Sequence, residues 1–212
     1  MRRQDDFWDK AARKYAADPI KDEASYRRTL EATAARLTPQ DRVLEVGCGT
    51  GTTALRLAAG TGSYLGTDIS AQMIAIANEK AAAAGAGNLS FRKASVMEAG
   101  QAELDAGAPP FDAVLAFNML HMAEDLPKAL AALKARLKPG GLLISKTVCL
   151  KSWGWYMLPL IKAMQLVGKA PHVGFFSIAE LDQAMVDAGF RILEAGLHPA
   201  SRKARFLVAQ KV

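Results

Sequence analysis

The sequence predicts an α/β fold in which a doubly wound, mostly parallel sheet of seven strands is covered by helices. The first observation is the stretch of residues 43–53, where a short apolar run turns through glycines into a segment of helical composition. The second is residues 63–68, a short strand-like run that ends in an acid. The third is the alternation of strand-like and helix-like segments that follows, which is typical of βαβ units. At 212 residues the chain suits a single domain.

The composition is that of an ordinary globular protein, with 50% hydrophobic and 23% charged residues. No apolar run reaches the ~18 residues that span a bilayer. Residues 1–6 are charged and have no apolar core behind them, unlike a signal peptide. The two cysteines, Cys48 and Cys149, fit a reducing compartment, and with three scattered histidines they give no metal-ligand spacing. We therefore expect a cytoplasmic protein without a bound metal.

The chain is mildly basic, with a formal net charge of +6 and a pI near 9.4. Such a charge can favour nucleic acid, anionic lipid or an acidic substrate. The basic residues are spread along the sequence, and the densest group, residues 202–205, lies at an expected turn. We interpret the charge as scattered solvated side chains and expect no nucleic-acid partner.

Residues 1–38 precede the first strand and predict two helices. Residues 5–17 carry an apolar and aromatic stripe at spacings of three and four, formed by Phe7, Trp8, Ala11, Ala12 and Tyr15. Asp18-Pro19 ends this helix, and the second covers residues 22–37. We expect Trp8 to dock the first helix on the core.

Three glycines at alternate positions, Gly47, Gly49 and Gly51, lie between the first strand and the next helix. Such a turn exposes backbone N–H groups at the positive end of the helix dipole, so a ligand can lie close to the main chain. We expect a threonine to cap the helix start. The pattern E-x-G-x-G-x-G begins at Glu45 and differs from the dinucleotide fingerprint G-x-G-x-x-G, because Thr52 occupies the third glycine position.

The second strand, residues 63–68, ends at Asp68. An aspartate at the tip of this strand, beside the first glycine turn, can accept hydrogen bonds from both hydroxyls of a ribose. The glycine turn, its strand and Asp68 together predict a site for a ligand that contains a nucleoside.

The remaining elements follow in order. A helix over residues 70–84 begins with Ser70 as its N-cap and stops at Gly85. Further strands are predicted at residues 89–94, 111–117, 142–148, 190–197 and 204–210, and further helices at 97–106, 126–137 and 178–188. Pro139-Gly140-Gly141 is the predicted turn into the fifth strand.

Residues 151–176 follow the fifth strand and are rich in aromatic and apolar side chains, among them Trp155, Tyr156 and Phe175. Doubly wound sheets bind ligands at the carboxyl ends of their strands, so this insertion starts at the ligand edge. We expect an apolar wall of the substrate site, with a small second core or a membrane-surface contact as alternatives.

Residues 40–148 resemble the class I S-adenosylmethionine-dependent methyltransferases, which have a Rossmann-like fold. The resemblance rests on four motifs in order, at residues 43–51, 66–70, 111–121 and 137–144. It implies S-adenosylmethionine as the cofactor, bound by Tyr15, Glu45, Gly47, Cys48, Gly49, Gly51, Asp68, Ile69, Met73, Ser95, Val96 and Asn118.

The same resemblance implies roles for the flanking segments. Residues 1–38 would cover the cofactor as a lid, and residues 151–176 would cap the substrate through Trp155, Tyr156 and Phe175. Residues 177–212 would add a helix and a strand hairpin with one antiparallel strand. The family often has an acid just past the third strand that binds the adenine amino group, whereas this chain has Ala94-Ser95-Val96, so Ser95 or a backbone group would substitute.

Methyl transfer from a sulfonium is a direct displacement that needs neither a metal nor a covalent enzyme intermediate. A protonated acceptor also needs a base, and His121, just past the fourth strand, is the candidate because imidazole titrates near neutrality. Packing, or a hydrogen bond to a carbonyl, is the alternative role for His121. The predicted function is a methyltransferase acting on a small-molecule acceptor that is at least partly apolar.

Two other classes share parts of the pattern. A nicotinamide-dependent oxidoreductase would share the strand–glycine–helix unit and Asp68, but Thr52 and the aromatic helix ahead of the first strand disfavour it. An RNA or DNA methyltransferase would suit the basic pI, but relatives that methylate base amino groups often carry paired prolines where this chain has Asn118-Met119-Leu120. A non-catalytic relative that only binds the cofactor is a further alternative.

Overall fold

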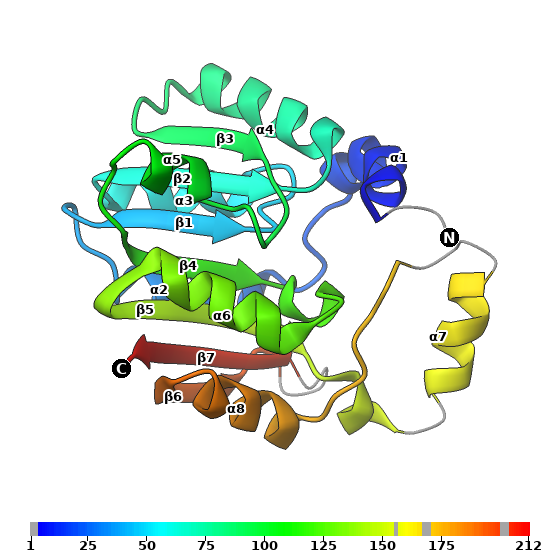
Figure 1. The fold of residues 1–212 in the computed structure, drawn as a ribbon. Helices are drawn as coiled ribbons and strands as arrows, with labels where there is room; N and C mark the ends of the chain where they lie inside the picture. The colour runs from blue at the N-terminus through cyan, green and yellow to red at the C-terminus, as the bar shows by residue number, and fades with distance from the viewer. Residues whose placement is uncertain (1–3, 155–156, 167–170, 200–203) are drawn as a thin grey trace.

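A computed structural model describes residues 4–154, 157–166, 171–199 and 204–212 of the chain and shows a twisted sheet with helices on both faces (Figure 1). In the described residues the sheet has seven strands in the order β3-β2-β1-β4-β5-β7-β6. β7 is antiparallel to both β5 and β6, while the other neighbouring strands are parallel, which confirms the predicted fold class. The strands are β1 Arg42–Val46, β2 Ser63–Asp68, β3 Leu89–Lys93, β4 Phe111–Phe117, β5 Leu137–Val148, β6 Phe190–Leu197 and β7 Ala204–Lys211.

The helices divide between the two faces of the sheet. The α-helices are α1 Gln4–Ala17, α2 Glu23–Ala34, α3 Thr52–Leu57, α4 Ala71–Ala84, α5 Gln101–Asp105, α6 Leu126–Arg136, α7 Met157–Leu166 and α8 Ile178–Asp187. Short 3₁₀ turns are η1 Ala58–Gly60, η2 Leu120–Met122 and η3 Leu150–Trp153. α1 and α7 lie beyond the arrowheads of the parallel strands, at the edge where doubly wound sheets bind ligands (Figure 1).

Successive side chains along each strand point to opposite faces of the sheet and pack into a hydrophobic core on each face. On one face, Leu44 and Leu143 pack with Leu133 of α6 and Leu181 of α8. On the other face, side chains such as Val43 and Ile144 pack with the inner sides of α3 and α4. Because both faces are covered, the exposed backbone ends of the strands remain as the place for a ligand.

The structure corrects two details of the predicted elements. α3 has Gly51 as its N-cap, with φ +74° and no side-chain cap, so the expected threonine cap is wrong. β5 begins at Leu137, and the expected turn at residues 139–141 is part of the strand. Two bonds from β7 reach this early part of β5: the Lys211 ammonium donates to the Leu137 carbonyl at 2.6 Å, and the Gln210 amide donates to the Gly140 carbonyl at 3.1 Å.

Candidate active site

A cavity of about 910 Å³ opens at the carboxyl ends of β1, β2 and β4. Its wall is completed by α1, the loop after β3 and the start of α6. It brings together nine of the residues predicted to bind the cofactor: Tyr15, Gly47, Gly49, Asp68, Ile69, Met73, Ser95, Val96 and Asn118. The described lining does not include Glu45, Cys48, Gly51, His121 or Phe175. Trp155 and Tyr156 lie outside the described residues.

The glycine turn takes a path that side chains would block. Gly47, Gly49 and Gly51 have φ values of +67°, +54° and +74°, in the left-handed region that glycine tolerates best. A Cβ on Gly47 would lie 2.6 Å from Cγ of Met119, and a Cβ on Gly51 would lie 2.6 Å from Cζ of Phe91. The neighbouring side chains therefore pack directly against the main chain of the turn, and Gly47 and Gly49 belong to the cavity lining.

Asp68 is fixed beside this turn by two backbone N–H groups. One carboxylate oxygen accepts from Gly49 at 3.0 Å and the other accepts from Ser70 at 2.9 Å. Burial raises the pKa of Asp68, and these two hydrogen bonds act in the opposite direction. Since each carboxylate oxygen has a second acceptor position, Asp68 can accept further hydrogen bonds from a ligand in the cavity.

Glu45 lies beneath the glycine turn rather than in the cavity wall. Its carboxylate is buried and accepts a hydrogen bond of 2.7 Å from the Tyr64 hydroxyl. Burial raises the pKa of Glu45 to about 7. Burial also raises the pKa of the Cys48 thiol well above its ordinary value, so this cysteine stays protonated at neutral pH. Both residues are buried, and neither belongs to the cavity lining.

α1 supplies one wall of the cavity through Gln4, Asp5, Trp8 and Tyr15. Trp8 therefore belongs to the cavity lining, and its expected role in docking the helix on the core stays a prediction. The Trp8 ring meets the Tyr15 ring edge-on, with centroids 6.4 Å apart. Tyr15 lies over the glycine turn, where its Cε1 atom is 3.6 Å from the position of a Cβ on Gly49.

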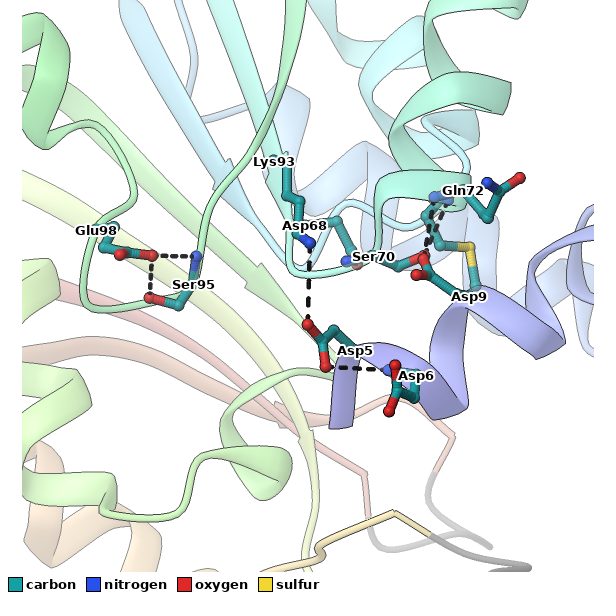
Figure 2. A network of polar contacts seen from close by, with 10 residues as sticks. Asp5, Asp6, Asp9, Asp68, Ser70, Gln72, Lys93, Ser95 and Glu98 are labelled. Carbon is teal, nitrogen blue, oxygen red and sulfur yellow. Dashed lines mark hydrogen bonds and ion pairs between the residues drawn. The ribbon is translucent and has the colours of Figure 1, made fainter. Parts of the chain in front are cut away.

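The loop after β3 contributes Ser95, Val96, Met97 and Glu98 to the lining. The backbone N–H and the hydroxyl of Ser95 both donate to the Glu98 carboxylate, at 3.1 and 2.7 Å (Figure 2). These bonds lower the pKa of Glu98, so it is ionised at neutral pH. Sequence reasoning missed Glu98, although the spacing S-x-x-E of a capping box was a signal that could have found it.

Asn118 directly follows β4 and has an unusual backbone conformation. Its φ is +53°, in the left-handed region, where asparagine is among the few tolerated side chains. Its N–H donates to the Lys146 carbonyl of β5 at 2.6 Å. This turn directs the chain into η2 and so places Met119 and Met122 in the cavity lining.

His121 is separated from the described lining of the cavity. Its side chain is 8% exposed, Nδ1 has no hydrogen-bond partner, and burial lowers its pKa to about 4. A neutral imidazole with so low a pKa is a weak general base. Neither its position nor its acidity favours the predicted role, and we do not assign His121 as the base.

The cap expected at residues 151–176 stays a prediction, because Trp155 and Tyr156 lie outside the described residues. Within the described residues, none of its side chains belongs to the cavity lining. The Gly174 N–H donates to the His121 carbonyl at 2.6 Å, and the Lys151 N–H donates to the Phe176 carbonyl at 3.2 Å. The first bond joins the return segment to η2, and the second joins it to η3.

Sequence reasoning also missed an apolar wall built from distant segments. The apolar part of the lining is formed by Phe117, Met97, Met119, Met122 and Ala123, and the lining also includes the polar residues Glu124, Asp125 and Lys128.

In the part of the chain that the structure describes, no helix has the length and apolarity to cross a bilayer. The same described residues contain no group of three or more His, Cys, Asp or Glu side chains arranged to hold a metal.

Known proteins share this sequence pattern and fold. A family model described as a methyltransferase domain matches residues 13–195. The ubiquinone biosynthesis O-methyltransferase of Paracidovorax citrulli is 28% identical over 130 residues, which cover 61% of this chain and 52% of that protein. The reducing polyketide synthase BOA6 of Botryotinia fuckeliana is 31% identical over 181 residues, which cover 81% of this chain and 7% of that protein. The chain thus spans about half of the first relative and a small part of the second.

Among solved structures, the magnesium protoporphyrin IX methyltransferase ChlM from Synechocystis PCC 6803, with bound SAH, is similar with a TM-score of 0.72. The two are 19% identical, and the match covers 98% of both chains. At this identity the likeness supports the fold, while the family model, which spans most of the chain, establishes membership. The chain therefore belongs to the methyltransferase-domain family.

Proposed function

We propose that the cavity binds S-adenosylmethionine and that the enzyme transfers its methyl group to a small, at least partly apolar acceptor. The observation that carries the proposal is the position of Asp68. Its carboxylate is fixed by the Gly49 N–H at 3.0 Å, beside a turn whose Gly47 and Gly49 belong to the cavity lining. A carboxylate held in this way suits the paired hydroxyls of a ribose, and a lining of glycines suits a ligand that lies close to the backbone.

The cavity also suits the other parts of the cofactor. Ile69 and Met73 offer apolar contacts next to Asp68 for the adenine ring, and the loop of Ser95 and Val96 offers backbone groups at its edge. Because the Ser95 hydroxyl already donates to Glu98, we propose that Glu98 supplies the negative charge that the loop lacks at position 95. Asn118 and Tyr15 border the space above the glycine turn, where the methionine part would lie.

The acceptor would occupy the remainder of the cavity, between α1 and η2. At about 910 Å³ the cavity lies near the upper end of the range for ligand pockets, which leaves room for a second small molecule. Its wall of Phe117, Met97, Met119 and Met122 is apolar, and methionine side chains adapt to irregular shapes. Two similar proteins, an O-methyltransferase of ubiquinone biosynthesis and the magnesium protoporphyrin IX methyltransferase, have names that are in keeping with a partly apolar acceptor.

When bound, S-adenosylmethionine supplies a methyl group on a positively charged sulfur. The side chains around it would act by position and by excluding water. The aromatic ring of Trp8 and the side chains of Met119 and Met122 would exclude water from the reacting space, which favours a transition state in which the positive charge is dispersed. Holding the acceptor in line with the reacting bond is a large source of rate, since well-oriented reactions gain about 7–11 kcal/mol in favourable cases.

Two measurements test the proposal in sequence. Calorimetry with S-adenosylmethionine, S-adenosylhomocysteine and NAD tests the cofactor, and we expect binding of the first two in preference to NAD. Incubation with methyl-labelled cofactor and a fractionated cell extract, followed by identification of the labelled product, tests the acceptor. Tight binding of NAD without binding of S-adenosylmethionine contradicts the first part, and a strongly polar product without an apolar portion contradicts the second.

A further inference from the structure

α1 is attached to the rest of the molecule by contacts on two sides. Trp8 and Tyr15 face the cavity. Next to Trp8, the Asp9 side chain turns instead toward the N-terminus of α4 (Figure 2). One Asp9 carboxylate oxygen accepts the Ser70 hydroxyl at 2.6 Å and the Gln72 backbone N–H at 3.1 Å. A single acid therefore joins a helix of the cavity wall to the helix that follows β2.

The partner of Asp9 is itself part of the site's framework. Ser70 is fully buried, and its hydroxyl oxygen accepts the Met73 N–H at 3.0 Å as the N-cap of α4. The Ser70 N–H donates to Asp68, which in turn holds the Gly49 N–H. Asp9 is thus connected through Ser70 and Asp68 to the glycine turn, although Asp9 does not line the cavity.

Charge favours the contact between the Asp9 carboxylate and the N-terminus of α4. The hydrogen bond from Ser70 lowers the pKa of Asp9, and a carboxylate is favourable at the positive end of a helix such as α4. By comparison, Asp5 and Lys93 are 3.8 Å apart in a solvent-accessible ion pair, and the Gln4 amide donates to the Met122 carbonyl at 3.3 Å (Figure 2 shows the ion pair). Asp9 differs from these contacts in that its carboxylate accepts two hydrogen bonds at the N-terminus of α4, one of them from the fully buried Ser70.

We propose that Asp9 is a positioning residue that holds α1 over the cavity and thereby controls how fast the cofactor exchanges. The inference rests on the proposed function in so far as the cavity binds S-adenosylmethionine. Since Trp8 and Tyr15 form one wall of the cavity, a bound molecule is covered as long as α1 stays docked. When the Asp9 contact is lost, α1 undocks more often, and both entry and departure of the cofactor become faster.

The experiment compares the wild-type chain with Asp9→Ala, with the milder Asp9→Asn, and with Asp6→Ala as matched control. Asp6 is an exposed acid of the same helix, so its replacement removes the same charge without touching α4. The first readout uses no ligand: trypsin cleavage after Lys10, Arg13 or Lys14, which are exposed on α1, followed by mass spectrometry. The second readout is the dissociation rate of S-adenosylhomocysteine in stopped flow, followed by tryptophan fluorescence because Trp8 lines the cavity.

We expect Asp9→Ala to raise both rates about tenfold, because a hydrogen bond to a charged group contributes enough to change an equilibrium by this factor. Asp9→Asn keeps an acceptor oxygen and should be intermediate, while Asp6→Ala should match the wild type. Thermal denaturation must show similar midpoints, so that cleavage reports on α1 rather than on global unfolding. Cleavage that does not change in Asp9→Ala, or that rises equally in Asp6→Ala, overturns the proposal.

The two readouts separate this inference from the proposed function. If Asp9→Ala is cleaved faster but releases S-adenosylhomocysteine at the wild-type rate, the proposal that Asp9 controls cofactor exchange is overturned, because α1 would then undock without releasing the cofactor. If the wild type binds neither S-adenosylmethionine nor S-adenosylhomocysteine, the proposed function fails and control of cofactor exchange falls with it. In that case the cleavage readout, which needs no ligand, still shows whether Asp9 holds α1 on α4.

Discussion

Replacing Asp68 tests the proposed cofactor site most directly. The Asp68 carboxylate is held by the N–H groups of Gly49 and Ser70, so its orientation is fixed before a ligand arrives. Asp68→Ala removes both acceptors for the ribose hydroxyls, and a hydrogen bond to a charged group contributes about 1.5–3 kcal/mol. Loss of one such bond weakens binding by about 10-fold to 150-fold, and loss of both weakens it further.

A matched control separates this loss from general damage. Asp112 is also an aspartate of the sheet that accepts a backbone N–H, that of Arg42 at 2.8 Å, and it bonds the Lys138 ammonium at 2.6 Å. It begins the β4 region at the opposite end of the strands, and it does not line the cavity. Asp112→Ala should lower stability without changing cofactor affinity. Calorimetry on both variants, with circular dichroism to verify folding, checks the result, and an unchanged dissociation constant in folded Asp68→Ala refutes the reasoning.

Three further predictions concern the turn and the apolar wall. The pKa of Glu45 is raised from 4.5 to about 7 in the folded state, so its stabilising contribution is complete below pH 4.5 and is lost as the pH rises through 7, by about 3 kcal/mol. Glutamine cannot ionise, so the free energy of unfolding of Glu45→Gln, measured with urea, should equal that of the wild type near pH 4.5 and exceed it at pH 8. Equal free energies of unfolding at both pH values would contradict the raised pKa of Glu45. Gly47→Ala should destabilise the fold by about 1–3 kcal/mol and weaken cofactor binding, because the new Cβ would lie 2.6 Å from Met119 at a φ of +67°. Thermal melts and calorimetry measure both effects, with Gly87→Ala as control because no atom lies within 4 Å of a Cβ there. Met122→Glu should reduce acceptor turnover at least tenfold while the cofactor dissociation constant changes by less than threefold, and equal losses in both would mean that Met122 faces the cofactor instead.

The strands and the first part of the site could be predicted because their signals are local. The glycine turn follows β1 directly, and Asp68 ends β2, so parallel pairing of the two strands brings them together without further information. The same reasoning placed Asn118 at the neighbouring strand end, since β1 also pairs with β4. Alternation and strand order therefore fix which residues reach the ligand edge.

The apolar wall could not be predicted in this way, because it depends on where irregular segments turn. Met122 reaches the cavity because Asn118 adopts a left-handed conformation before η2, and many sequences of similar composition would continue differently. The course of the insertion depends on irregular segments in the same way. Its aromatic composition predicts a cap, and the residues that carry this prediction, Trp155 and Tyr156, lie outside the described residues. The Gly174 N–H donates to the His121 carbonyl and so joins the return segment to η2, a contact that composition does not indicate.

α4 explains why supporting residues can matter as much as those that line the cavity. Its N-cap Ser70 bonds both Asp68 and Asp9, and so joins the cofactor side of the site to α1. One turn from its other end, the Lys80 ammonium donates to the hydroxyls of Thr50 and Thr52 at 3.1 and 3.2 Å, which fastens the glycine turn to the same helix. The glycine turn and the α1 wall of the cavity are thus both anchored on α4. A change that shifts α4 should move both together, whereas loss of the Asp9 contact should release α1 alone and leave the glycine turn in place.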